Sequence, residues 1–193
     1  MPARPRSTER CGKPPNSRRV MSSYAIELLS AAHDRVGFAS GLESVDRYFR
    51  EVARGHLEKG VSITRVLVGA NAGSPKPVLG FFTLSGIVVE AKPWPGAPKG
   101  LPSQAVPAVL LGRLAVAAVH HGKGFGAMLV AAACQLAHET IVRTGGIGLV
   151  VDAAHQQAAS FYVGFGFKPV SPDQLRLFLP AKSLAGTAII PRG

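Results

Sequence analysis

Cysteine is scarce in this sequence, and its shortage excludes several kinds of protein. Cys11 and Cys134 are the only two cysteines among 193 residues. The chain therefore holds neither a disulfide framework nor the paired cysteines of a structural zinc site. Free thiols are typical of a reducing compartment, so we expect a cytoplasmic protein. The histidines also lack the spacing of a zinc ligand set, and we expect no metal.

Long hydrophobic runs are missing as well. The longest apolar segment, Met128–Ala133, is far shorter than the roughly 20 residues with which a helix crosses a bilayer. The N-terminus is basic, but no apolar stretch of the kind found in a secretory signal follows it. We therefore expect a protein that has no membrane as a partner.

Acidic residues are few, because 11 of them stand against 22 lysines and arginines, and the formal net charge is +11. Residues 1–20 carry +5 of this charge and almost no apolar periodicity, which predicts a disordered basic leader or an arm that helps to hold nucleic acid. The remaining +6 favours a polyanionic partner or an anionic cofactor, although the same charge can simply serve solubility. Length and composition predict one packed domain over 21–185, followed by a tail over 186–193.

Hydrophobic periodicity predicts strands and helices in alternation. We expect strands over 24–29, 64–70, 78–89, 108–119, 147–152 and 175–179, and helices over 42–56, 126–143 and 156–163. Ser44 and Asp46 are candidate N-terminal caps of the first helix, and the five prolines within 91–107 predict a loop. The order of these elements indicates an α/β protein with a mixed sheet.

A glycine-rich turn joins the strand at 114–116 to the helix at 126–143. Its sequence is His121-Gly122-Lys123-Gly124-Phe125-Gly126. Unpaired amides and the helix dipole favour an anion there, glycine lets the backbone approach a phosphate closely, and Lys123 adds positive charge. The spacing is neither that of a P-loop nor that of a dinucleotide-binding turn. It suits the diphosphate of coenzyme A, although such a turn is equally typical of a purely structural connection.

At this turn the sequence resembles the GNAT family of acetyltransferases. The family's acetyl-CoA motif, Gln/Arg-x-x-Gly-x-Gly/Ala, is similar to residues 121–126, with His121 in the place of Gln or Arg. A second stretch, residues 158–167, resembles the family's Ala-x-x-Phe-Tyr-x-x-Phe-Gly-Phe ending. The two motifs are separated by a helix and a strand, as the family's fold requires.

The resemblance implies the fold and the site. It implies a single domain with a mixed, mainly antiparallel sheet that splays at an acetyl-CoA cleft and is flanked by helices. It implies that Tyr162 protonates the departing thiolate, which a phenol with a pKa of about 10 can do. The residues implied to bind the cofactor are Leu114, Ala115, Val116, His121, Gly122, Lys123, Gly124, Phe125 and Gly126.

The N-terminal half is similar to one branch of this family. Residues 38–49 resemble the Phe-x-Cys-Gly-x-x-x-Leu-Asp-x-Tyr/Phe-Leu pattern of GNAT toxins from bacterial toxin–antitoxin pairs, with Ser40 for Cys and Val45 for Leu. Residues 107–116 resemble the same group's Pro-x-x-Leu-Leu-Gly-Arg-Leu-Ala-Val. Most members of this group have an aspartate shortly after this stretch, where this sequence has Ala117 and Ala118.

This second resemblance implies a dimeric toxin that acetylates the α-amine of aminoacyl-tRNA, blocks translation and is neutralised by a ribbon-helix-helix antitoxin. Arg113 is then a candidate phosphate contact, and Trp94 a candidate for stacking on the CCA end, beside Lys92 and Lys99. Packing within the loop is the alternative for Trp94, and a structural role on the strand surface is the alternative for Arg113. Two other functions stay open: acetylation of a protein or small-molecule amine, and binding of coenzyme A without catalysis.

Some further residues have expected roles. A histidine (His120, His121 or His155) could act as a base through water, although an aminoacyl amine has a pKa near neutrality and needs little help. Asp152 is expected to cap the helix that follows it, and orienting the surroundings of Tyr162 is the alternative. The aromatic residues of the second motif that we expect in the core are Phe161, Phe165 and Phe167.

Overall fold

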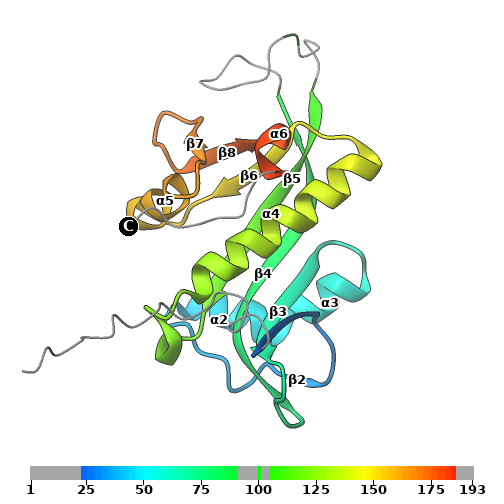
Figure 1. Cartoon of the computed structure of the whole chain (residues 1–193), viewed down its shortest axis with the longest axis vertical. Helices are drawn as coiled ribbons and strands as arrows, with labels where there is room; N and C mark the ends of the chain where they lie inside the picture. Colours follow the sequence, from blue (N-terminus) through cyan, green and yellow to red (C-terminus); the bar gives the residue numbers. More distant parts are fainter. Residues whose placement is uncertain (1–22, 91–99, 101–104, 186–193) are drawn as a thin grey trace, which may run out of the picture.

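The computed structural model describes residues 23–90, 100 and 105–185. The predicted leader over 1–20, the tail over 186–193 and most of the proline-rich segment lie outside these residues. The described chain forms an eight-stranded sheet with helices packed against it (Figure 1). The predicted α/β class with a mixed, mainly antiparallel sheet is confirmed.

The strands follow one another across the sheet with few crossovers. They are β1 (Tyr24–Leu28), β2 (His33–Asp34), β3 (Ile63–Gly69), β4 (Lys76–Val89), β5 (Val106–Val116), β6 (Gly148–Asp152), β7 (Lys168–Pro169) and β8 (Arg176–Pro180). Their spatial order is β1-β3-β4-β5-β6-β8-β7, and β2 pairs with β4 beside this path. Neighbours are antiparallel except for β5 with β6 and β2 with β4. The parallel step needs a crossover, and a long helix supplies it.

The helices are α2 (Glu43–Arg47), the π-helical η1 (Tyr48–Val52), α3 (Ala53–Glu58), the short 3-10 turn η2 (Ala118–His120), α4 (Phe125–Thr144), α5 (Gln156–Val163) and α6 (Ala181–Leu184). The first three continue into one another and match the helix expected over 42–56. The π turn in the middle adds a residue to the helical period. Tyr48 and Phe49, although adjacent, are consequently both buried.

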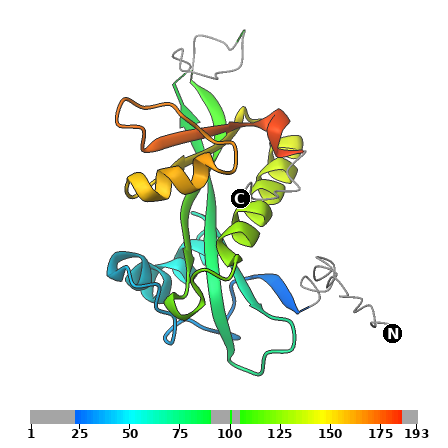
Figure 2. The ribbon, with the colours of Figure 1, turned by 60° about the vertical axis from the view of Figure 1, so that its left-hand side comes forward.

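Two apolar layers cover the two faces of the sheet. On one face α4 packs on β4 and β5 through Leu129, Val130 and Ala133, which are fully buried. On the other face α2, η1 and α3 pack on β3 and β4, where Phe49 stacks on Phe81 at 4.3 Å between ring centroids. Figure 2 shows α4 on one side of the long strands and these helices on the other. The sheet is thus held from both sides along its middle.

Helix α4 is the core helix of the fold. By length and composition alone it could cross a membrane. The longest apolar segment of the sequence did not indicate this. The apolar side chains of α4 instead fill the interface with the sheet, together with Leu149 and Leu179 of the neighbouring strands. A helix that is apolar on most sides is equally typical of a buried core helix.

Several boundaries differ from those expected. The strand predicted over 108–119 ends at Val116, because the chain turns into η2 after Ala117 donates its amide to the Leu79 carbonyl. The elements β2, β7 and α6 were not predicted, and each has at most four residues. Such short segments carry no periodic signal.

The expected capping of the first helix by Ser44 and Asp46 is wrong. Within the described residues no side chain caps α2. Asp46 lies on the buried side, 4% exposed, and its Oδ1 accepts hydrogen bonds from the backbone amide of Ser40 at 2.8 Å and from the Ser40 hydroxyl at 2.5 Å. The carboxylate therefore ties the helix to the segment before it, instead of closing the helix end.

This buried contact makes a first prediction. Asp46→Ala should lower the free energy of unfolding by about 1–3 kcal/mol, because the Ser40 amide loses its acceptor in a buried place. Asp46→Asn keeps an oxygen at the same position and should lose less than about half as much. Urea unfolding followed by circular dichroism measures both, and equal losses for the two variants would contradict the assignment.

Candidate active site

The sheet opens between β5 and β6. The two parallel strands pair only over Val109–Leu111, opposite Leu149–Val151, and from Gly112 to Val116 the described chain places no strand against that edge of β5. Alternate residues of a strand turn their amides and carbonyls to opposite sides. Ala117 donates its amide to β4, so the amides of Leu114 and Val116 face the open edge. The splay expected from the family resemblance is present.

The glycine turn follows at the wide end of this opening. Gly122 and Gly124 have φ of 75° and 82°, the left-handed region that only glycine adopts freely. A Cβ atom built on either glycine would meet no atom within 4 Å, so the space in front of the turn is open. Neither a side-chain cap nor an acidic residue occupies the first turn of α4. The first amides of a 20-residue helix are thus available to an anion, which fits a diphosphate.

Two basic side chains stabilise the turn itself. The His121 ring lies 2.9 Å through Nε2 from the carbonyl oxygen of Val116, and the Lys123 ammonium donates to the Val119 carbonyl at 3.1 Å. Both side chains are exposed. The family position of Gln or Arg is therefore taken by a ring that binds the last carbonyl of β5, and this fixes the strand end relative to the turn.

Tyr162 lies in α5, inside the cluster of buried residues that also contains α4 side chains. It is 6% exposed, and its ring meets the Phe167 ring edge-on, with centroids 5.7 Å apart. Burial raises the pKa of Tyr162 above its ordinary value. The phenol consequently stays protonated at neutral pH, which a proton donor requires.

The expected cap of α5 is wrong. Asp152 forms a two-point ion pair with Arg176 of β8, at 2.6 and 2.8 Å, which ties two neighbouring strands. The cap is His155, whose Nδ1 accepts a hydrogen bond from the Ala158 amide at 3.2 Å. The prediction failed because aspartate is a common residue at a helix N-cap and histidine is not. His155 thereby sets where the helix that carries Tyr162 begins.

Phe161 differs from its expected place in the core. It is 39% exposed, and a Cβ atom added to Gly126 would lie 3.2 Å from its ring. Phe161 therefore packs beside Gly126 and brings α5 against the start of α4, while the space in front of Gly122 and Gly124 stays open. Phe167 is buried as expected, and Phe165 is partly buried.

Arg113 projects on the opposite face of β5 from α4, where its guanidinium carbon lies 3.7 Å from the centroid of the Tyr48 ring. The sequence pattern gave no sign of this contact with Tyr48. The other expected tRNA contacts, Lys92, Trp94 and Lys99, lie outside the described residues.

Cys134 offers no competing chemistry. It is fully buried in α4, and burial raises its pKa to about 12, so the thiol is not a nucleophile at neutral pH. Among the residues that the structure describes, no three His, Cys, Asp or Glu side chains gather to hold a metal ion. The open edge of β5, the turn and Tyr162 are therefore left as the candidate machinery.

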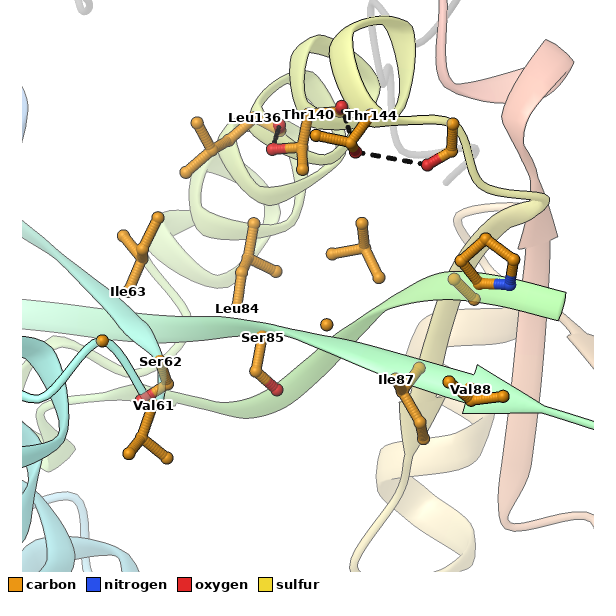
Figure 3. A pocket seen from close by; sticks show the side chains of 16 residues that line it. Val61, Ser62, Ile63, Leu84, Ser85, Ile87, Val88, Leu136, Thr140 and Thr144 are labelled. Atoms are coloured by element: carbon orange, nitrogen blue, oxygen red, sulfur yellow. Dashed lines mark hydrogen bonds between the residues drawn. The ribbon is translucent and has the colours of Figure 1, made fainter.

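A cavity of about 520 Å³ lies elsewhere, between the C-terminal half of α4 and the strands β3 and β4. Figure 3 shows Leu136 and Thr140 of α4 above Ile63 and Leu84 of the strands. Its described lining holds apolar and hydroxyl side chains and no titratable group. This described lining offers no cation and no helix N-terminus for a diphosphate, and no side chain that titrates near neutral pH, so the cavity is a poorer candidate for the site.

Comparisons with known proteins agree with this geometry. Residues 83–169 match the model of the acetyltransferase (GNAT) domain. The chain is 34% identical over 163 residues to a tRNA-acetylating toxin of Mycobacterium tuberculosis, which covers 84% of this chain and 95% of the toxin. The chain belongs to the GNAT acetyltransferase family, and acetyl-CoA is the acyl donor of this family.

Within the family, the relatives are toxins. The structure of AtaT complexed with acetyl-methionyl-tRNAfMet has a TM-score of 0.76 at 30% identity and covers 84% of this chain and 97% of that one. A tyrosine-to-phenylalanine mutant of AtaT, bound to acetyl-CoA and the C-terminus of the antitoxin AtaR, has a TM-score of 0.71 at 29% identity and covers 84% and 96%. This protein is thus a homologue of tRNA-acetylating toxins.

The capping of α5 gives a second prediction. His155→Ala should lower the free energy of unfolding by about 0.5–1 kcal/mol, because the Ala158 amide loses its acceptor. His155→Asn supplies a side chain that caps well and should restore stability. Thermal unfolding of the three proteins measures the effect, and an alanine variant as stable as the wild type would show that the cap does not stabilise α5.

Proposed function

We propose that this protein acetylates the α-amine of an amino acid esterified to tRNA and thereby blocks translation. The observation that carries the proposal is the unpaired edge of β5 leading to an uncapped helix N-terminus. Such an edge can hold the amide groups of an extended pantetheine arm, while the turn holds the diphosphate. The similarity to tRNA-acetylating toxins supports charged tRNA as the acceptor.

The transfer is direct. The acceptor amine forms the new N–C bond at the thioester carbonyl, and the amide of Leu114, on the open edge of β5, stabilises the oxyanion. As the C–S bond breaks, Tyr162 gives its proton to sulfur and regains one that the amine has released. No base is needed when the amine is already neutral, and an α-amine has a pKa of about 8.

The proposed partners follow from the same relatives. We infer a homodimer that acts in the cytoplasm and is neutralised by an antitoxin of the ribbon-helix-helix class. The support is that AtaT binds the C-terminus of its antitoxin AtaR. The net charge of +11 suits the polyanionic backbone of a tRNA.

The test is an incubation of the protein with radiolabelled acetyl-CoA and total charged tRNA, followed by sequencing of the labelled tRNA. We expect label on the aminoacyl end of one or a few tRNA species. Label found only on protein or on small amines would identify another acceptor. Binding of acetyl-CoA without any transfer would indicate a binding module.

Tyr162 provides the third prediction. Tyr162→Phe should lower kcat by about a hundredfold or more, since general acids contribute about 10²–10⁴-fold. The affinity for acetyl-CoA should change less than about twofold, because the ring keeps its packing against Phe167. Single-turnover kinetics and isothermal titration separate the two effects, and a kcat within about threefold of wild type would exclude Tyr162 as the acid.

The pH dependence of the acetyl-transfer rate provides the fourth prediction. The rate should rise up to about pH 8 as the acceptor amine loses its proton. It should then stay level to about pH 10, because burial raises the pKa of Tyr162 and keeps the phenol protonated. Rapid-quench measurements, faster than hydrolysis of the aminoacyl ester, give the profile. A falling limb centred below about pH 9 would contradict the role of the tyrosine.

A further inference from the structure

A bulge in β5 decides where Arg113 points. Thr83 of β4 pairs with Arg113 and Leu84 pairs with Leu111, so Gly112 is an extra residue in β5. Without the bulge, residues 111 and 113 would share a face, because side chains alternate along a strand. Leu111 instead packs under α4, and Arg113 lies with Ala115 on the face covered by α2, η1 and α3.

This face lies opposite the one on which we place the cofactor, which leaves it to the acceptor. Phe125 of the glycine turn, Leu129 of α4 and Tyr162 all belong to the opposite cluster, and the cofactor would occupy that side. An extended pantetheine arm that runs from the turn back along β5 passes one residue of the strand about every 3.3 Å. Its acyl end therefore lies near Gly112 and Arg113, where β5 and β6 meet. Arg113 stands at the narrow end of the opening, on the acceptor side.

The Tyr48 ring packs against one flat side of the Arg113 guanidinium. Tyr48 comes from the π-helical segment η1, a feature that is frequent at functional sites, and the residue is 6% exposed. The Tyr48 hydroxyl lies 3.4 Å from both His56 Nδ1 and Ser62 Oγ, and the His56 ring meets the tyrosine edge-on at 5.6 Å. These contacts fix the ring under a cation that is itself exposed.

No hydrogen-bond acceptor among the described residues occupies the N–H groups of the Arg113 guanidinium. Among the described residues Arg113 forms no ion pair, whereas Arg50, Arg54 and Arg176 are each paired with a carboxylate. Stacking on a ring uses one flat side of the guanidinium and leaves its N–H edge available. An edge with several N–H groups suits a phosphate, which it can bind at two oxygens.

We propose that Tyr48 is a positioning residue that holds Arg113 to bind a backbone phosphate of the single-stranded acceptor end of tRNA. The inference rests on the proposed function, and it adds how the acceptor is held. The pair would place the esterified amine at the narrow end of the opening by anchoring the phosphate beside it. The ring contributes by restricting the arginine before the tRNA arrives.

The experiment measures the dissociation constant of charged tRNA without acetyl-CoA over a series of KCl concentrations. Arg113→Gln should weaken binding about tenfold and reduce the slope of log Kd against log [KCl] by about 0.7–0.9, the value of one phosphate contact. Arg113→Lys should keep most of the slope but bind about threefold more weakly, since a lysine neither stacks flat nor forks. Tyr48→Leu should resemble Arg113→Lys, and Tyr48→Phe, which keeps the ring, should stay within about twofold of wild type.

Arg143→Gln is the matched control. It removes one exposed positive charge at the far end of α4, about 30 Å from the turn, and should leave the affinity and slope near their wild-type values. The acetyl-CoA affinity and the melting temperature of each variant report whether it is folded. Arg113 is exposed, so its variants should fold even if Tyr48→Leu does not.

The outcomes separate the two proposals. If wild-type protein acetylates charged tRNA but Arg113→Gln keeps the wild-type slope, or Arg113→Lys binds as tightly as wild type, the inference about Arg113 and Tyr48 is wrong. A lower affinity with an unchanged slope would indicate stacking on a base and would equally overturn the phosphate contact. If wild-type protein transfers acetyl groups only to other amines, the proposed function itself is wrong.

Discussion

Backbone N–H and C=O groups need hydrogen-bond partners. The proposed site of this protein depends on the part of β5 that has no neighbouring strand on one edge among the described residues. The strand is paired on both edges over Val109–Leu111, and beyond Leu111 the described residues pair with it on only one edge. Amides that are left open beside a protein core are costly unless water or a ligand satisfies them. The parting of β5 and β6 therefore creates a slot with regularly spaced donors. The uncapped start of α4 extends that slot to a site for an anion.

The bulge at Gly112 divides the two sides of this slot. It lets Leu111 belong to the core under α4 and Arg113 to the opposite face. The proposed proton donor, Tyr162, is buried on the first side, and Arg113, which has no carboxylate partner among the described residues, is exposed on the second. Burial helps the phenol to keep its proton, and exposure lets the guanidinium meet a phosphate from solvent. One extra residue in a strand thus separates the two electrostatic environments that the proposed chemistry requires.

Local chemistry could be predicted from the sequence, and long-range pairing could not. The glycines at 122 and 124 were identified because left-handed backbone and glycine go together, and α5 was predicted at its observed bounds. The splay entered only through the family resemblance, since the loss of a strand partner leaves no mark in β5 itself. Asp152 was misassigned because its partner, Arg176, is brought to it by the fold. Asp46 was misassigned although its partner is local, because it accepts from Ser40, which lies before the helix, and not from the helix's own first amides.

The central claim is that the open β5 edge and the glycine turn bind acetyl-CoA through their backbone amides. Amide hydrogen exchange with and without acetyl-CoA tests it directly, because exchange slows at amides that gain a partner. We expect slower exchange at Leu114, Val116 and residues 122–126. Unchanged exchange there, or protection confined to the cavity lined by Ile63, Leu84 and Leu136, would contradict the account.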